Sequence, residues 1–200
     1  MVSDRPTARQ GWREADIMVT HVNAEAPGDE RGALIAFVEA QRGGIRRSVL
    51  GLSDEQASGR PSASELNLAG LVKHVAETEL NWLRMAQQKP NERQRTEETW
   101  GDSFRLVEGE TLADVLAFWA EVAAETDAFI RAVPSLDDTF PLPDQPWFPD
   151  DGAVSMRWLM LHLVEEIGRH AGHADIIRES LDGKTAFELV ALDQGYASQS

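Results

Sequence analysis

Apolar residues recur at three- and four-residue intervals in four separate segments of the chain, which is the spacing of an amphipathic helix. The first segment begins near Glu30 and includes ALIAFVEAQRGGIRRSVLG. The second is LNLAGLVKHVAETELNWLRMA, the third is LADVLAFWAEVAAETDAFIRAV after Thr111, and the fourth extends from near Ser155 to Gly183. No convincing run of alternating apolar and polar residues indicates a strand. The pattern predicts an all-α fold, a four-helix bundle whose site is built between facing helices.

Prolines and glycines punctuate these helical segments. Pro90 should end the second helix and Pro134 the third, because proline removes a backbone donor and clashes with the preceding turn. The loop at 134–152 contains five prolines and cannot be helical throughout. Gly43 and Gly44 weaken the first helix and indicate a bend or the close approach of a neighbour. We therefore expect a bundle with long connecting loops.

Two of these loops carry aromatic residues among charged residues or prolines. Trp100 and Phe104 lie in the loop at 91–109 and indicate that it folds back over apolar surface. Trp147 and Phe148 lie in the proline-rich loop and have two interpretations. They either cap the end of the bundle or wall a cleft above the site.

The breaks divide the chain of 200 residues into three parts. Residues 1–29 are polar and irregular and are expected to form an N-terminal extension. Residues 30–183 are expected to form the bundle, and residues 184–200 a C-terminal tail. The tail contains one more apolar stretch, Phe187 to Leu192, which is long enough to dock on the bundle or on a second subunit. It predicts a homodimer or another small oligomer.

The fourth helix carries the most distinctive chemistry of the chain. At about 100° per residue its apolar residues fall on one line, namely Met156, Met160, Leu163, Ile167, Ala171 and Ala174. Glu166 and His170 stand one turn apart at the edge of that line. There they can offer a carboxylate oxygen and an imidazole nitrogen to one ion. His162 and His173 fall further toward solvent.

A third metal ligand has to come from another helix, and His74 in the second helix is the best candidate. It borders the apolar stripe made by Leu68, Leu71, Val75, Trp82 and Ala86. Groups at such an edge are partly desolvated and still within reach of a cleft. This position suits a catalytic ion with open coordination positions better than a closed structural site.

The spacing also allows interpretations without a metal. A histidine at a stripe edge is commonly a hydrogen-bonded boundary residue, and Glu166 can instead pair with Arg169 or His170 on a solvated face. The E-x-x-x-H pattern occurs by chance in acidic helices. His162, His173 and Asp175 are either surface or packing residues or groups that support the site, and no catalytic role is assigned to them.

The isolated His74 after a polar turn and the run E-x-x-x-H-A-G-H-A-D on the last helix resemble the DinB superfamily. More narrowly, they resemble the actinobacterial branch that contains mycothiol-dependent maleylpyruvate isomerase. Many DinB-like proteins hold a metal with one histidine on the second helix and an H-x-x-x-H pair on the last. Glu166 here replaces the first histidine of that pair, as in the mycothiol-dependent group. The resemblance spans residues 30–183 and implies a DinB-like four-helix bundle with His74, Glu166 and His170 as ligands.

The same resemblance implies a function. It indicates a divalent-metal-binding protein, with zinc as the first choice and nickel as the second. The implied reaction uses mycothiol or another small thiol and an electrophilic substrate, in a transferase or an isomerase. Two other classes stay open, namely a metal-binding stress or interaction module without turnover and a metal-dependent hydrolase. The chain lacks the paired E-x-x-H motifs of a ferritin-like di-iron site and the H-E-x-x-H motif of a zincin protease.

Composition narrows the chemistry further. The chain has no cysteine, which excludes a protein thiol nucleophile, a zinc-thiolate site and a disulfide framework. Any thiol must therefore arrive as a small molecule. The N-terminal residues lack the apolar run of a signal peptide, and no segment approaches the length of a membrane span. We therefore expect a cytoplasmic protein that does not bind membranes.

The charge of the chain bears on its partners. Its formal net charge is −15, which would repel a phosphate backbone over most of the surface, so nucleic-acid binding is not expected. The local exceptions are basic groups in the first helix and in a loop, namely Arg42, Arg46, Arg47, Arg93 and Arg95. These arginines are interpreted as serving the helix dipole or an anionic substrate.

Overall fold

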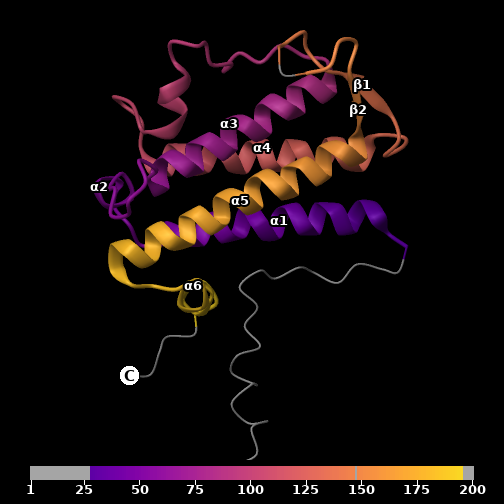
Figure 1. Ribbon diagram of the computed structural model, residues 1–200. Coiled ribbons are helices and arrows are strands. Elements are labelled where there is room, and N and C mark those ends of the chain that lie inside the picture. Colours follow the sequence, from indigo (N-terminus) through magenta and orange to yellow (C-terminus); the bar gives the residue numbers. More distant parts are fainter. Residues whose placement is uncertain (1–27, 147, 196–200) are drawn as a thin grey trace, which may run out of the picture.

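Four long helices form the body of the protein in a computed structural model that describes residues 28–146 and 148–195. They are α1 (Glu30–Ser48), α3 (Leu68–Gln87), α4 (Leu112–Ala132) and α5 (Met156–Asp182). Figure 1 shows them packed side by side, with α1 and α5 running in one direction and α3 and α4 in the other. The predicted all-α four-helix bundle is confirmed.

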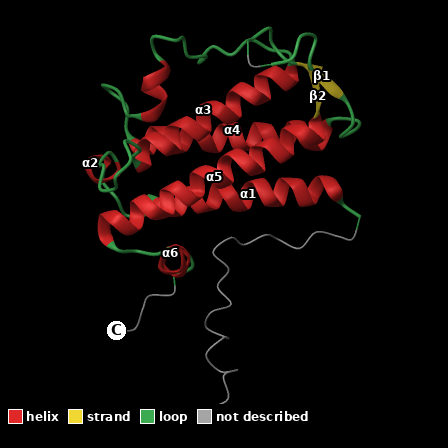
Figure 2. Ribbon diagram, in the orientation of Figure 1, coloured by secondary structure: helices red, strands yellow, loops and turns green. Residues whose placement is uncertain are grey.

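The structure also contains shorter elements outside the four long helices (Figure 2). They are α2 (Asp54–Ala57), the 3-10 helix η1 (Trp100–Phe104), strands β1 (Thr139–Pro141) and β2 (Ala153–Ser155), and α6 (Ala186–Asp193). The strands pair in antiparallel fashion and close the proline-rich loop. The sequence pattern does not predict this hairpin, because a strand of three residues is too short to show an alternating pattern. The predicted extension at 1–29 falls outside the described residues, except for Gly28 and Asp29.

The helices begin and end where capping residues place them. Thr111 caps α4, because its side chain accepts a hydrogen bond from the backbone N–H of Asp114. The Asp114 carboxylate in turn accepts one from the backbone N–H of Thr111. At the start of α5 the Ser155 side chain accepts a hydrogen bond from the backbone N–H of Trp158. At the other end of α5, Gly183 takes a left-handed conformation with φ of 78°, which glycine adopts without strain. These boundaries agree with those expected from the sequence.

The core lies between the apolar stripes of the four helices. All the stripe residues predicted for α3 and α5 are buried, including Trp82 and Leu163, and Trp119 of α4 is buried with them. Gly44 of α1 marks the close approach of a neighbour, because a Cβ atom there would lie 3.4 Å from the Cβ of Ala171 on α5. The pair α1 and α5 is therefore tightly packed along the helix that carries Glu166 and His170.

The tail helix α6 packs against α1 of the same chain. Its residues Leu189 and Val190 are buried, whereas Phe187 and Leu192 are exposed. This apolar stretch was expected to dock on the bundle or on a second subunit. At least one of its faces packs on the bundle of its own chain. None of the helices in the described part of the chain is long and apolar enough to cross a membrane.

Arg42 corrects one expectation from the sequence. It is fully buried among α1, α3 and α4, and it serves neither the dipole of α1 nor an anionic substrate. Its Nε donates to the carboxylate of Glu79 at 3.2 Å, and its Nη1 donates to Asp127 at 3.0 Å. The indole N–H of Trp119 also donates to Glu79, at 2.9 Å. The core therefore contains an ionic network that ties three helices together.

The other basic residues have surface partners. Arg46 and Arg47 occupy the last turn of α1, where positive charge is favourable, and Arg46 pairs with Glu39. Arg95 pairs with Glu77. Arg93 lies over the ring of Phe118, with its guanidinium carbon 4.1 Å from the ring centroid. Arg47 lies 4.0 Å from the carboxylate of Asp193 in α6, so each of the four arginines has a partner within the chain.

A long crossover at residues 88–111 returns the chain from the end of α3 to the start of α4. Several contacts hold this crossover against α3. The side-chain amide of Asn67 donates to the backbone oxygen of Phe104 at 3.3 Å. The Lys73 ammonium donates to the backbone oxygen of Arg105 at 3.1 Å and also pairs with Glu110. At Gly70 an added Cβ would lie only 2.0 Å from the Phe104 oxygen, so the crossover passes directly over a helical glycine.

Replacing Gly70 with alanine is expected to destabilise the protein. The new methyl group would push the crossover off α3, and overpacking of this kind costs about 1–3 kcal/mol, more than the roughly 1 kcal/mol that alanine gains in helix propensity. Gly172 in α5 is the matched control, because an added Cβ there meets nothing within 4 Å. Urea unfolding should show a lower free energy for Gly70→Ala and an equal or higher one for Gly172→Ala. Equal stability of the two variants would contradict the packing argument.

Candidate metal centre

Three side chains predicted as ligands converge between α3 and α5. His74, Glu166 and His170 each offer one ligand atom, and these atoms all lie within 4.8 Å of one another. The Nε2 atom of His170 lies 3.2 Å from Oε1 of Glu166, and the Nε2 atom of His74 lies 3.5 Å from the same oxygen. The four-residue spacing puts Glu166 and His170 on one face of α5, and the packing of α3 against α5 brings in His74.

The cluster is charged and partly screened from water. Hydrogen bonds from His170 and His74 hold the pKa of the Glu166 carboxyl well below its usual range, against the opposing effect of burial. Glu166 is therefore ionised at neutral pH. Both histidines are buried, whereas Glu166 is half-buried, so the carboxylate gives access to the centre. Two imidazole nitrogens and one carboxylate oxygen form a donor set suited to a divalent cation.

The crossover covers the His74 side of the cluster. The ring of Phe104 stacks on the His74 imidazole with centroids 4.2 Å apart and an interplanar angle of 22°. Trp100, one turn earlier in η1, meets the same imidazole edge-on at 6.3 Å. The contacts of Asn67, Gly70 and Lys73 with the crossover thus determine where Phe104 lies. The loop does fold back onto α3, but Phe104 lies on an imidazole and Trp100 stays 58% exposed, so the expected cover of apolar surface is not what this stack provides.

A second group of rings adjoins the cluster on its other side. His162 on α5 stacks on Trp158 with centroids 5.0 Å apart, and it meets the ring of Trp82 at 4.6 Å. Burial lowers the pKa of His162, so this imidazole is neutral at pH 7. Phe148 packs against Trp82 at 6.2 Å, a contact that agrees with both interpretations of this residue, as a cap of the bundle end and as a wall of a cleft. Trp147 lies outside the described residues.

Other candidate residues lie near the cluster without joining it. His173 is exposed, and its Nδ1 lies 3.4 Å from Nδ1 of His170. Burial raises the pKa of Asp175, which is not part of the cluster. Arg169 donates to Glu165, and Glu166 bonds to the two histidines instead of forming a surface pair with Arg169.

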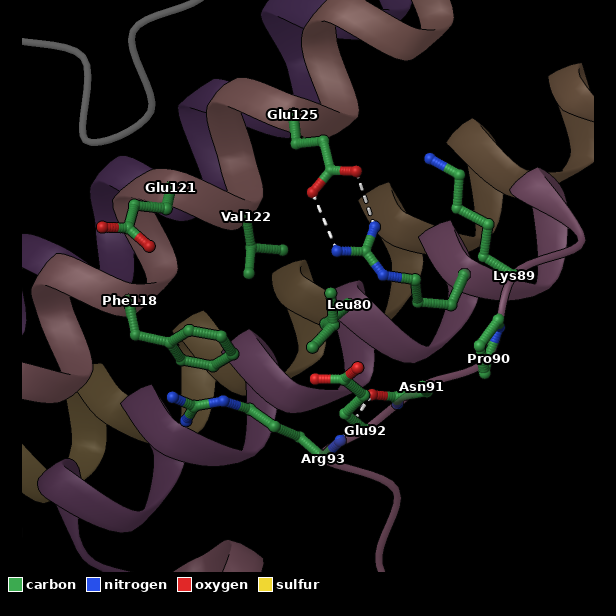
Figure 3. Close-up of a pocket in the computed structure, with 11 residues that line it drawn as sticks. Leu80, Lys89, Pro90, Asn91, Glu92, Arg93, Phe118, Glu121, Val122 and Glu125 are labelled. Atoms are coloured by element: carbon green, nitrogen blue, oxygen red, sulfur yellow. Dashed lines mark hydrogen bonds and ion pairs between the residues drawn. The ribbon is translucent and has the colours of Figure 1, made fainter.

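A pocket on another face of α3 is separate from this centre. It has a volume of about 490 Å³ and lies between α3, the crossover and α4 (Figure 3). Arg84 and Glu125 form a two-bond ion pair across it, at 2.6 and 2.9 Å. Lys89, Glu92 and Arg93 add charges of both signs at its rim. The metal-centre candidates lie between α3 and α5 and do not line this pocket.

Two comparisons place the chain among known proteins. Residues 33–183 match the family model described as Mycothiol-S-transferase. A solved structure, described as the conserved protein of locus from Enterococcus faecalis, has the same fold, with a TM-score of 0.53 and 16% sequence identity over 76% of this chain and 96% of that chain. No curated protein matches the chain. Because the family model covers most of the sequence, the chain belongs to the mycothiol-S-transferase family, which is DinB-like, as the sequence resemblance indicated.

Proposed function

We propose that this protein is a metal-dependent S-transferase that joins a small thiol, with mycothiol as the first candidate, to an electrophilic substrate. The observation that carries the proposal is the convergence of two imidazoles and one ionised carboxylate from two helices. The family to which the chain belongs supports thiol transfer over isomerisation.

The three residues fit a divalent ion. His74, Glu166 and His170 would hold it, and nitrogen and oxygen donors suit zinc first and nickel second. Three protein ligands are typical of catalytic zinc sites, which keep a further position for water or substrate. The two imidazoles are neutral donors and the carboxylate supplies one negative charge. The centre therefore retains net positive charge, which attracts a thiolate.

The reaction requires a sulfur atom from outside the chain, because the sequence contains no cysteine. A bound divalent ion would supply Lewis acidity that lowers the pKa of a coordinated thiol. In the transfer, a bond forms between the thiol sulfur and the electrophilic carbon. The leaving group departs with its electron pair, and the thiol proton passes to solvent. Phe104 orients the His74 imidazole by stacking on it, and burial of both histidines keeps bulk water from them.

Turnover is expected to depend on a low-molecular-weight thiol. The purified protein, loaded with zinc, would be assayed with mycothiol, with N-acetylcysteine and without thiol, against 1-chloro-2,4-dinitrobenzene and iodoacetamide. The expected result is enzyme-dependent thioether formation that is faster with mycothiol than with N-acetylcysteine. Consumption of the electrophile at an equal rate without thiol would instead indicate a metal-dependent hydrolase. A protein that binds zinc and accelerates neither reaction would fit a binding module.

The homodimer stays a prediction. Phe187 and Leu192 remain exposed on α6 and offer apolar surface for a second subunit, whereas Leu189 and Val190 are already used within the chain. Because the chain is strongly acidic, an interface between two copies would have to be mainly apolar.

A further inference from the structure

A stripe of four residues on α5 connects the candidate metal centre with an aromatic group. Trp158, His162, Glu166 and His170 are spaced four residues apart, and each step advances about 6 Å along the helix axis. His162 therefore stands one turn from Glu166, and Trp158 stands two turns from it. The same stripe that supplies two candidate ligands continues toward the end of the bundle at which α5 begins.

Trp82 of α3 completes the aromatic group. Its ring centroid lies 5.2 Å from that of Trp158 and 4.6 Å from that of His162. The imidazole of His162 and the indole of Trp158 are nearly parallel, with an interplanar angle of 10°. All three rings stand on long helices, so their positions are fixed by the packing of the bundle. They form a preorganised wall, which we call the aromatic wall.

Packing of the core explains only part of this arrangement. Trp82 is buried, and the contacts of Trp158 with it shield one side of the core. Trp158 nevertheless leaves 40% of its area exposed, on the same stripe of α5 as the half-buried Glu166 and two turns away from it. An indole that only capped the core would gain by folding flat onto it. The exposed area instead offers apolar surface to a molecule that occupies the metal centre.

We infer that the aromatic wall, with Trp158 and His162 on its accessible face and Trp82 buried behind them, binds the electrophilic substrate through an uncharged, flat aromatic or conjugated body. This inference rests on the proposed S-transfer. Along the helix axis His162 stands about 6 Å and Trp158 about 12 Å from Glu166, so a flat body lying over these two side chains would have its reactive carbon toward the centre. The wall itself bears no ionised group at neutral pH, because burial lowers the pKa of His162. Aromatic stacking favours such a body, and small aliphatic electrophiles gain little from it.

Binding can be tested without turnover. The probe is 4-nitroaniline, a flat, uncharged and unreactive molecule, titrated into the full chain by isothermal calorimetry or by ligand-observed NMR. Trp158→Ala should raise the Kd of the probe about three- to tenfold, the loss expected when one aromatic stack is removed. Trp158→Phe should restore most of the affinity, because it keeps an aromatic face. Phe187→Ala is the control, since Phe187 is 53% exposed on α6, away from the centre.

The variants give clear outcomes. An unchanged Kd in Trp158→Ala, or an equal rise in Phe187→Ala, would overturn the inference. A rise in Trp100→Ala with none in Trp158→Ala would also overturn it and would place the aromatic body beneath the crossover. Circular dichroism and thermal unfolding establish that each variant is folded.

Kinetics supply the second measurement. Trp158→Ala should raise KM for 1-chloro-2,4-dinitrobenzene and leave KM for iodoacetamide unchanged. Equal effects on both electrophiles would contradict a role in selecting the substrate. The proposed function and the aromatic wall are tested by different results. Turnover that does not depend on a thiol would contradict S-transfer. The binding of 4-nitroaniline to wild type and to His74→Ala would still test the aromatic wall.

Discussion

His74→Ala is expected to lose stoichiometric zinc binding. His74 is the sole candidate ligand from α3 in the described cluster, and the remaining pair on α5 would leave the ion with two protein ligands. Loss of a residue that only orients a ligand costs roughly 10–100-fold in metal affinity, so loss of the ligand itself should exceed about 100-fold. Metal analysis after dialysis and competition with a chromogenic chelator measure this change.

The role of the Glu166 carboxylate can be tested with two matched substitutions, one at Glu166 and one at its neighbour Glu165. Glu166→Gln keeps the shape of the side chain and removes the charge that bonds to both histidines, so it should also weaken zinc binding strongly. Glu165→Gln makes the same change one residue earlier, at an exposed position that pairs with Arg169, and should bind zinc as wild type does. Retention of one zinc per chain by both His74→Ala and Glu166→Gln would remove these residues as ligands.

The long helices could be predicted because their apolar residues repeat with a helical period and their ends carry recognisable caps. Thr111, Ser155 and Gly183 are residues whose local chemistry starts or stops a helix without help from the rest of the fold. The short hairpin and α2 could not be predicted in this way. Three or four residues show no period, and their structure depends on the bundle end that they cover.

The candidate metal centre could be predicted only in part from the sequence. Spacing alone places Glu166 next to His170, since both stand on one helix. Bringing His74 to them requires that α3 and α5 face each other, which helix periodicity does not specify. The aromatic residues around the centre were harder still to predict. The stack of Phe104 on His74 depends on a crossover held by Asn67, Gly70 and Lys73, and no local pattern relates those residues to Phe104.

The ionic network of the core was missed for a physical reason. Charged residues are usually exposed, so Arg42 was assigned, together with Arg46 and Arg47, to the helix dipole or an anionic substrate. Its spacing contained a signal, because Arg42 continues the buried stripe of α1, which consists of Ile35, Val38, Ile45 and Val49. Glu79 likewise lies on the buried face of α3. A charged residue in the middle of an apolar stripe predicts a buried partner of opposite charge.

Arg42→Ala is expected to produce the largest loss of stability. Burial opposes the charge on Arg42, but Glu79 and Asp127 raise its pKa above the ordinary value, so the network consists of paired charges. Removing Arg42 would leave the fully buried carboxylate of Glu79 with only the indole of Trp119 as a donor. Breaking a buried pair by deleting one partner costs about 3–5 kcal/mol. Urea unfolding should therefore show a decrease of that size in the free energy of unfolding.

A double substitution distinguishes loss of pairing from loss of packing. In Arg42→Met with Glu79→Gln, both buried charges disappear, the side chains keep similar volumes, and the amide oxygen at position 79 can still accept from Trp119. This variant should be more stable than Arg42→Ala, because an unpaired buried charge costs more than an uncharged replacement pair. Arg60→Ala is the surface control. Its exposed pair with Glu65 should contribute less than about 1 kcal/mol. If the double variant were as unstable as Arg42→Ala, the stability would come from the shape of these side chains and not from their charges.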